Sequence, residues 1–431
     1  MCQVKIGSTT EQIICGADNC NAGKLVVVAH VGAIMPSTLQ IILSELWGVI
    51  SNGMLCSERE LGLEVTTTGK KLCYYQKNNI ILAIVFERNI IMGKIKAGYY
   101  SAVYFLKTAN ILKHEKPNDI VTIQFFQREE NVILAGIDAC VELLKTEAFN
   151  SESLEIVALT DGDLIQANEP VLKITGHYYQ FGHLEGIIDG ILARQTSIAT
   201  NCHRVLQAAN NKPVIYMNDR SDYYYNQEND GAAAKIGGIT NFVTAAQVTK
   251  LEDNYEPMGT VPHALIQAFN GDLIVALKAY QNFYPTDKLV ALVDYNNDVI
   301  TDTLQVAHQF SNLYAVRVDT SKALIDKYFV GKESKYPADE INGVNKHLIR
   351  ALRQALDHEG YQHVKIIVSS GFNAQKIATF EKEGVPVDIY GVGKLLAKIN
   401  IGFTGDAVQL NGVDQAKVGR HNIVSNRLVK K

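Results

Sequence analysis

An excess of charge of one sign is missing from this chain of 431 residues, which carries 41 Lys and Arg against 45 Asp and Glu. A formal net charge of −4 gives no electrostatic signal for nucleic-acid binding, so we expect no nucleic-acid partner. With 47% apolar and 20% charged residues, the composition is that of an ordinary globular protein. It excludes a disordered or fibrous chain.

An uninterrupted hydrophobic run is also missing. The apolar stretch at residues 25–50 is broken by His30, Pro36, Gln40 and Glu45, whereas a membrane span needs about 20 consecutive apolar residues. The stretch also begins too late for a signal peptide. We interpret it as a strand followed by a helix, and we expect a cytoplasmic protein with no membrane partner.

Cysteine is scarce after the first part of the chain, and none of the seven cysteines follows Cys202. An odd number of cysteines in a long chain argues against a secreted disulfide framework. The pair Cys15 and Cys20 lacks a second Cys or His pair at zinc-site spacing. We therefore expect reduced thiols and no zinc.

Residues 1–91 share no motif with the rest of the chain and contain its one tryptophan. Met92 opens a segment that reads like a protein start, so we interpret residues 1–91 as an unassigned extension. We expect a small α/β domain at residues 92–200 and a (β/α) barrel at 201–403. The tail at 404–431 is expected to return to the small domain.

Short, nearly continuous apolar segments dominate the second half of the chain. Alternating with helical patterns such as 347–359 and 374–383, they indicate a parallel sheet buried on both faces. Their number favours a (β/α) barrel, with an open doubly wound sheet as the alternative. The expected strands are 214–217, 238–243, 273–276, 289–293, 313–318, 364–369 and 387–390.

Polar residues and glycines collect directly after these strands. In a barrel such positions share the C-terminal face, where binding sites are built. Two consecutive loops, Ser370-Gly371 and Gly391-Val392-Gly393, offer backbone N–H groups ahead of helices and predict a phosphate site. The other residues that follow strands are Arg220, Asp294, Arg317 and Asp319.

His263 follows Gly259-Thr260-Val261-Pro262, a sequence typical of a helix start. A histidine in the first turn lies near the positive end of the helix dipole, which disfavours its protonation and favours an attached anion. A neutral imidazole that carries a phosphoryl group suits this place. A core or capping histidine is the alternative.

Tyrosines gather in two places, at Tyr99, Tyr100 and Tyr104 and at residues 223–225 beside Arg220. Aromatic faces next to an arginine suit a flat anionic ring. Surface or interface tyrosines are the alternative.

Taken in order, several of these motifs resemble one known family. They are Gly259-Thr260-x-x-His263, Val316–Thr320, Ser370–Phe372 and Val387–Gly393, preceded by Tyr99–Thr108 and followed by Phe403–Val408 and Ala416–Arg420. Over about residues 93–431 the chain resembles the nicotinate phosphoribosyltransferase family, a group of type II phosphoribosyltransferases. The resemblance implies an α/β domain joined to an irregular barrel.

The resemblance also implies an activity in NAD biosynthesis. Phosphoribose passes from phosphoribosyl pyrophosphate to nicotinate, which gives nicotinate mononucleotide and pyrophosphate. ATP is a co-substrate, coupled through a phosphohistidine at the position of His263. Magnesium is the expected cofactor, at Asp319 and Asp294.

Further site residues follow from the resemblance, position by position. Arg317 and Asp319 match the pair near the ribose, and Tyr104 matches an aromatic that reaches the pyridine ring of a neighbouring subunit in a head-to-tail homodimer. The resemblance gives Arg220, Glu185 and Arg194 a substrate-binding role; Asp294 joins them because its position at a strand end suits magnesium or ribose hydroxyls. The 5′-phosphate loops are those of Ser370, Gly371, Gly391 and Gly393.

The chain departs from the family at Met217, where relatives often have a ring-stacking phenylalanine; Tyr223 is the replacement that we consider. C-terminal zinc cysteines are absent. Alternatives are a quinolinate or nicotinamide phosphoribosyltransferase of the same fold, or a non-catalytic ligand-binding barrel. His263 argues against a quinolinate enzyme, which does not need a phosphorylated histidine.

Overall fold

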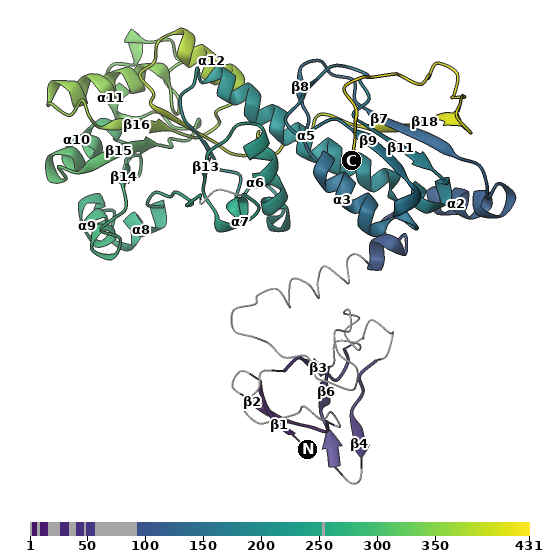
Figure 1. Cartoon of the computed structure of the whole chain (residues 1–431). Helices are drawn as coiled ribbons and strands as arrows, with labels where there is room; N and C mark the ends of the chain where they lie inside the picture. The colour runs from purple at the N-terminus through teal and green to yellow at the C-terminus, as the bar shows by residue number, and fades with distance from the viewer. Residues whose placement is uncertain are drawn as a thin grey trace. The chain divides into compact units, whose positions relative to one another are not determined.

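The computed structural model describes residues 2–6, 9–15, 26–33, 40–46, 49–56, 93–251 and 255–431 (Figure 1). Met92 and Cys20 lie outside these ranges, so the predictions that concern them are not examined by the structure. The described chain forms two compact units. The first comprises Met1–Asn110, Glu147–Phe149 and Gly182–Leu184, and the second comprises Ile111–Thr146, Asn150–Phe181 and Glu185–Lys431. The domain boundaries at residues 91 and 200 stay predictions.

In the first unit, the described residues before position 57 form three antiparallel strand pairs. They are β1 (Cys2–Ile6) with β2 (Thr9–Ile13), β3 (Val28–His30) with β6 (Gly53–Leu55), and β4 (Ser44–Leu46) with β5 (Val49–Ser51). The prediction of a strand followed by a helix at 25–50 is therefore wrong for the described part. Ser44 pairs with Ser51 in a hairpin, because the apolar residues there serve sheet pairing rather than a helical face.

The second unit contains a six-stranded antiparallel sheet in the order β19-β18-β7-β11-β9-β20. Buried and half-buried residues alternate along β11, as expected for a sheet with one covered face. Three strands come from the C-terminal residues 404–430: β18 pairs with β7, β19 pairs with β18, and β20 pairs with β9. Strands β8 (Val132–Ile133) and β10 (Leu164–Ile165) pair with each other in a separate two-stranded sheet. The other elements from residue 103 to 181 and after residue 403 are α2 (Val103–Glu115), which runs from the first unit into the second, β7 (Val121–Phe126), α3 (Ile137–Glu147), β9 (Glu155–Ala158), β11 (Leu172–Gly176), α4 (Tyr178–Phe181), β18 (Thr404–Leu410), β19 (Val413–Asp414) and β20 (Val429–Lys430).

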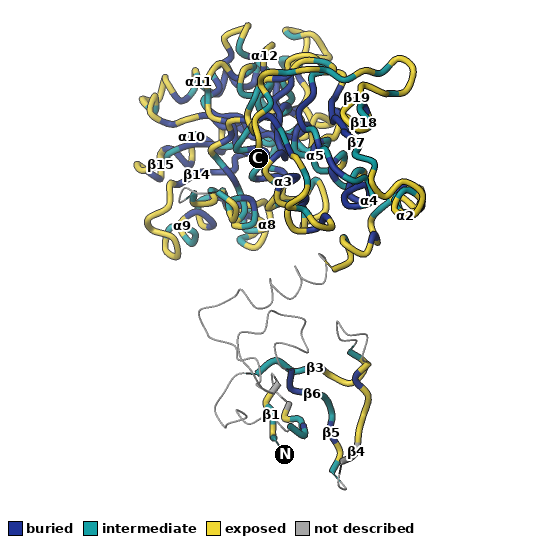
Figure 2. Tube along the Cα trace, turned by 45° about the vertical axis from the view of Figure 1, so that its right-hand side comes forward, coloured by how far each residue is buried: buried dark blue, intermediate teal, exposed yellow. Residues whose placement is uncertain are grey.

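A second six-stranded sheet is wholly parallel, in the order β13-β12-β17-β16-β15-β14. Its strands are buried almost throughout, as the dark core in Figure 2 shows. They are β12 (Val214–Tyr216), β13 (Asn241–Phe242), β14 (Leu289–Leu292), β15 (Leu313–Val318), β16 (Lys365–Val368) and β17 (Ile389–Val392). The helices around it are α6 (Gln227–Ile236), α7 (Ala245–Val248), α8 (His263–Ala268), α9 (Leu273–Phe283), α10 (Val299–Gln309), α11 (Lys346–His358) and α12 (Ala374–Lys382).

This parallel sheet curls into a half-barrel with β13 and β14 at its edges, which confirms the irregular barrel expected from the sequence. One strand prediction is wrong, because residues 273–276 begin helix α9. The Asp272 side chain caps this helix by accepting the N–H of Val275 at 3.0 Å. Leu273, Ala276 and Leu277 then share its buried face with helical spacing.

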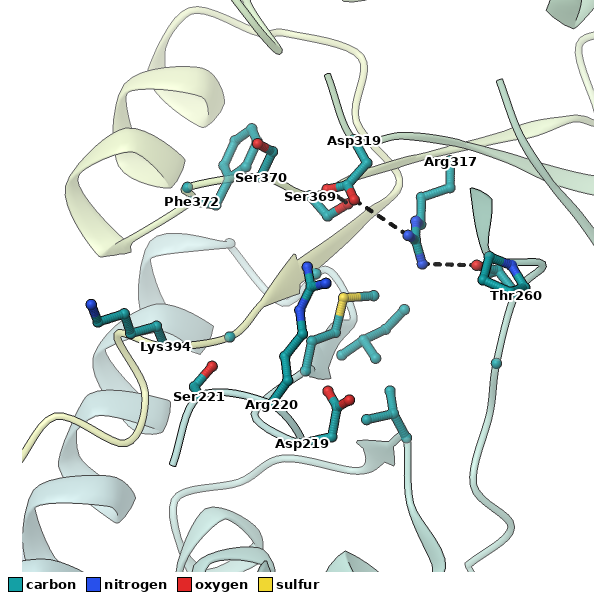
Figure 3. Close-up of a pocket in the computed structure, with 18 of the residues that line it drawn as sticks. Asp219, Arg220, Ser221, Thr260, Arg317, Asp319, Ser369, Ser370, Phe372 and Lys394 are labelled. Atoms are coloured by element: carbon teal, nitrogen blue, oxygen red, sulfur yellow. Dashed lines mark hydrogen bonds and ion pairs between the residues drawn. The ribbon is translucent and has the colours of Figure 1, made fainter. Parts of the chain in front are cut away.

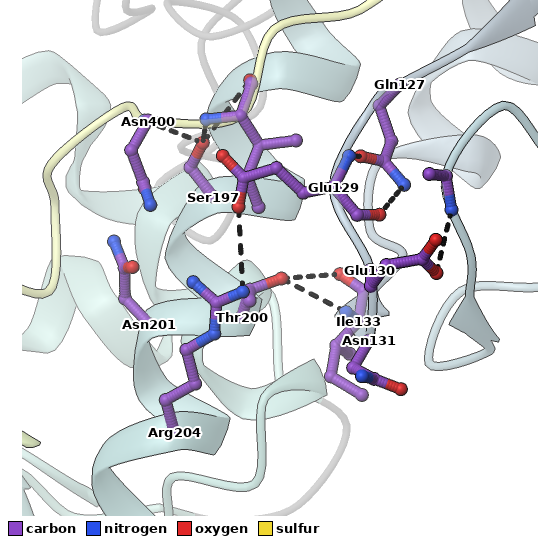
Figure 4. A network of polar contacts seen from close by, with 12 residues as sticks. Gln127, Glu129, Glu130, Asn131, Ile133, Ser197, Thr200, Asn201, Arg204 and Asn400 are labelled. Atoms are coloured by element: carbon purple, nitrogen blue, oxygen red, sulfur yellow. Dashed lines mark hydrogen bonds and ion pairs between the residues drawn. The ribbon is translucent and has the colours of Figure 1, made fainter.

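Helix α5 (Glu185–Ala208) contacts the separate β8–β10 strand pair, strand β18 of the antiparallel sheet, and the half-barrel. Thr196 bonds to the backbone N–H and C=O of Ala135, and Thr200 does the same at Ile133 (Figure 4). On the other side the helix packs against α6 and α12 of the half-barrel. None of the described helices has the length and apolar character needed to cross a membrane.

Candidate active site

A cavity of about 690 Å³ opens at the C-terminal ends of the parallel strands (Figure 3). Loops after β12, β15, β16 and β17 reach it, together with the start of α8. Its floor is apolar, formed by Ile215, Met217, Val243 and Met258. The polar residues that line it include Asp219, Arg220, Ser221, Thr260, His263, Arg317, Asp319, Ser369, Ser370 and Lys394.

Arg317 lies near the end of β15 and is fixed from two sides. Nη1 donates to Thr260 Oγ1 at 2.8 Å, and Nη2 to Asp319 Oδ2 at 3.4 Å. The other oxygen of Asp319 accepts from Ser369 Oγ at 2.7 Å. Arg317 Nε is buried with no hydrogen-bond partner in the described structure. Because a buried donor is normally paired, this free N–H fits a cavity that receives an anion.

His263 is the first residue of α8, as the sequence predicts, but this helix has only six residues. Its Nε2 lies 3.1 Å from Asp294 Oδ1, and the aspartate side chain is 7% exposed against 47% for the histidine. Burial raises the pKa of Asp294, and the pairing with His263 opposes this rise. A carboxylate on Nε2 favours the tautomer with its proton there, which leaves the lone pair on Nδ1.

The two expected phosphate loops differ in the space around their glycines. Ser370 and Gly371 both have left-handed backbone, with φ of 72° and 74°, and a Cβ on Gly371 would meet open space. A Cβ on Gly391 would lie 2.7 Å from the Met217 side chain, and one on Gly393 would lie 2.6 Å from the Met217 carbonyl oxygen. The first loop is open to a ligand, whereas the second is glycine-rich because it packs tightly on Met217.

The structure brings most of the sequence-predicted site residues into one cavity. It also adds Asp219, Ser221 and Lys394, which sequence reasoning missed. Lys394 follows β17 as Arg220 follows β12, so the same strand-end rule was available for it. The roles of all these residues stay predictions.

Four expected substrate-binding residues do not line the cavity, and one of them, Asp294, contacts it only through its pairing with His263. Tyr104 lies on α2 and is 64% exposed. Glu185 accepts a hydrogen bond from the Tyr178 hydroxyl at 3.4 Å, and burial together with the nearby Asp189 raises its pKa to about 7. Arg194 forms ion pairs with Asp222 and Asp230.

Asp319 and Asp294 are the expected magnesium ligands. They lie near enough for the charge of Asp319 to raise the pKa of Asp294. Within the described ranges, no three His, Cys, Asp or Glu residues gather into a metal-binding group. Because Mg²⁺ in phosphate sites is commonly held by one or two carboxylates and the substrate oxygens, this pair fits such a role.

Two family models match the chain. Residues 1–74 match "Putative tRNA binding domain", and residues 102–196 match the N-terminal domain of quinolinate phosphoribosyl transferase. The phenylalanine–tRNA ligase beta subunit of Campylobacter jejuni is 55% identical over 69 residues, which are 16% of this chain and 9% of that one. The N-terminal region thus has relatives that sequence analysis did not recognise.

The later part of the chain is similar to other proteins. A nicotinate phosphoribosyltransferase of Mycobacterium tuberculosis is 25% identical over 251 residues. These residues are 56% of this chain and 48% of that relative, so this chain spans about half of the relative's length. The crystal structure of nicotinate-nucleotide pyrophosphorylase from Pyrococcus furiosus superposes with a TM-score of 0.65 at 29% identity, covering 76% of this chain and 79% of the other. The chain belongs to the type II phosphoribosyltransferase family.

Proposed function

We propose that the protein is a nicotinate phosphoribosyltransferase that makes nicotinate mononucleotide and pyrophosphate in NAD biosynthesis. The observation that carries this proposal is the pairing of His263 with Asp294 at a cavity that also receives Arg220, Arg317 and Lys394. Three cations suit phosphoribosyl pyrophosphate and a carboxylate-bearing base. The similarity to the Mycobacterium tuberculosis nicotinate phosphoribosyltransferase supports the same substrate.

Loss of pyrophosphate from C1 leaves an oxocarbenium-like ribose, so catalysis requires charge neutralisation and positioning. Arg317 lines the cavity and supplies a positive charge for the departing pyrophosphate, while Thr260 and Asp319 hold the guanidinium in place. The Asp319 carboxylate also accepts hydrogen bonds from the ribose hydroxyls. Asp319 and Asp294 are the residues that would hold magnesium, which would supply further neutralisation of the pyrophosphate.

The pyridine ring fits the apolar floor of the cavity. Met217 offers a polarizable thioether in place of the family's phenylalanine, a favourable partner for an aromatic face. Arg220 supplies a guanidinium for the nicotinate carboxylate. A carboxylate rather than an amide is the matching partner for this cation, which supports nicotinate over nicotinamide.

ATP coupling is assigned to His263. Its Nδ1 lone pair attacks the γ-phosphorus of ATP, the bond to the bridging oxygen breaks, and ADP leaves. Asp294 accepts the Nε2–H and stabilises the positive charge that the ring gains. Water later takes the phosphoryl group and releases phosphate. We further propose a cytoplasmic head-to-tail homodimer, in which the exposed Tyr104 reaches the partner's pyridine site.

The test is pyrophosphate release from phosphoribosyl pyrophosphate with nicotinate, nicotinamide or quinolinate, each with and without ATP. We expect turnover with nicotinate, faster when ATP is present. Preference for nicotinamide, or for quinolinate with release of carbon dioxide, would replace the proposed substrate. An absence of turnover with all three bases would favour the non-catalytic alternative.

We propose RNA binding as a second function, carried by residues 1–74. Its support is the match to a tRNA binding domain and the 55% identity to part of a tRNA ligase subunit. This support argues against the expectation, drawn from net charge, of no nucleic-acid partner. The full chain should retain bulk tRNA in a filter-binding assay at low salt and lose it as salt rises. Retention no greater than that of a chain starting at Met92 would contradict this second function.

A further inference from the structure

Helix α5 carries polar side chains on the face that it turns toward the cavity loops. Arg194, Ser197 and Asn201 are spaced by three and four residues, which places them on one side of a helix. None of the three lines the cavity. Each of them bonds to a segment that follows a strand of the half-barrel.

Arg194 fixes the loop after β12. Its Nε and Nη2 donate to the two oxygens of Asp230, both at 2.7 Å, and Nη2 also pairs with Asp222. Asp230 is 2% exposed, so this end of the pairing is rigid, whereas Asp222 is 34% exposed. Asp222 comes directly after Asp219, Arg220 and Ser221, three residues of the cavity wall. The ion pair therefore ties this wall to α5.

Ser197 and Asn201 fix the loop after β17. Ser197 Oγ accepts the backbone N–H of Asn400 at 3.2 Å and of Ile401 at 3.0 Å. Asn201 Nδ2 donates to the carbonyls of Leu396 at 3.2 Å and Lys398 at 2.8 Å. Lys394, two residues before Leu396, lines the cavity.

The two loops touch each other as well. Met217 N–H donates to the Val392 carbonyl at 2.8 Å, and a Cβ on Gly393 would lie 3.7 Å from Ser221 Oγ. Figure 3 shows Arg220 and Lys394 on these neighbouring segments, with Ser221 between them in that view. The described structure contains no salt bridge of Arg220 or Lys394 with a carboxylate. The distance between Arg220 and Lys394 therefore depends on the contacts that hold the two loops against α5.

We propose that α5 is the positioning element of the polyanion subsite: Arg194 through Asp222, and Asn201 through the Leu396 and Lys398 carbonyls, set Arg220 and Lys394 at the separation that phosphoribosyl pyrophosphate requires. This inference rests on the proposed function for the identity of the anion. Arg194, Asp222 and Asn201 are positioning residues, because they act through the two cations. The apolar floor and His263 do not depend on them.

The test is binding of phosphoribosyl pyrophosphate to the full chain by calorimetry, followed by steady-state kinetics. Asp222→Ala releases the loop but leaves the buried Arg194–Asp230 pair intact. Asn201→Ala releases the other loop. We expect each variant to raise the Kd for phosphoribosyl pyrophosphate about tenfold, since small misplacements of binding groups are costly. The KM for nicotinate is expected to change less than about twofold. Asp222→Glu, which keeps the carboxylate, should restore part of the affinity.

Arg204→Ala is the matched control on the same helix, because Arg204 pairs with Glu129 at 3.6 Å and not with a cavity loop. Its affinity should equal that of the wild type. Wild-type affinity in both Asp222→Ala and Asn201→Ala, or equal losses for nicotinate and phosphoribosyl pyrophosphate, would overturn the inference alone. A wild-type chain that binds no phosphoribosyl pyrophosphate would overturn the proposed function together with it.

Discussion

At the scale of single residues, the sharpest claim concerns His263. If it carries the phosphoryl group, labelled ATP should leave an acid-labile, base-stable phosphate on the protein. His263→Ala should abolish the label and the ATP-stimulated part of the rate, and spare a basal transfer rate. Arg317 and Asp319 are untouched by this change, and they stabilise the ribosyl transition state independently of the ATP step.

The control for this experiment is His308→Ala, because His308 is exposed and pairs with Glu359 far from the cavity. It should keep both the label and the ATP stimulation. A wild-type enzyme that turns over with ATP and never becomes labelled would return His263 to a structural role at the start of α8.

Glu185 gives a prediction for stability against pH. Burial raises its pKa to about 7, so between about pH 4.5 and 7 the folded chain binds more protons than the unfolded chain. Stability contributed by this group is therefore present at low pH and lost as pH rises. Glu185→Gln should be more stable than the wild type at pH 8, by about 3 kcal/mol, and the difference should vanish near pH 4. Thermal melts at both pH values measure it, and an equal difference at both would contradict the assignment.

Sequence reasoning found those site residues whose role follows from position along one strand. Arg220, Arg317 and Asp319 each come at the end of an apolar segment, and His263 follows a helix-start sequence. Asp222 and Asn201 were out of reach, because their partners lie 28 and 195 residues away. Contacts of that span depend on the packed fold, which no local pattern encodes.

At the scale of elements, α9 shows why one strand was misassigned. Leu273-Ile274-Val275-Ala276 reads as a short apolar strand by composition alone. The signal that favours a helix is the N-cap residue, since the Asp272 side chain accepts a hydrogen bond from the Val275 N–H at 3.0 Å. Short buried helices and short buried strands have similar composition, so the capping residue decides between them.

The same contact predicts a stability change. Asp272→Ala should destabilise the protein by about 1 kcal/mol, the usual cost of losing a helix N-cap. Asp298→Ala is the comparison, because Asp298 occupies the N-cap of α10 without a side-chain cap bond and should cost less. Urea denaturation measures the free energy of unfolding of both variants. An equal decrease in both would show that the capping bond is not the cause.

At the scale of the whole molecule, the sequence distinguishes parts of the chain by their pattern of apolar residues. Nearly continuous apolar strands predicted the parallel half-barrel, because such segments are buried on both faces. The curl of the sheet and its open edges at β13 and β14 were not encoded in any single segment. The relatives of residues 1–74 escaped notice, since the short strands described before residue 57 show weak alternation and leave little pattern to recognise.

The last prediction concerns removal of that region. A chain that starts at Met92 should remain soluble and keep phosphoribosyl transfer, and it should lose tRNA binding. The residues that line the cavity all lie at position 215 or later. Contacts between residues 93–110 and the later segments of their unit are retained, since Ser101 bonds to the His183 carbonyl and Lys96 lies 5.6 Å from the Phe149 ring centroid. Pyrophosphate release and tRNA retention, measured on the full and shortened chains, test both halves. An insoluble or inactive shortened chain beside an active full chain would show that residues 1–91 are part of the catalytic fold.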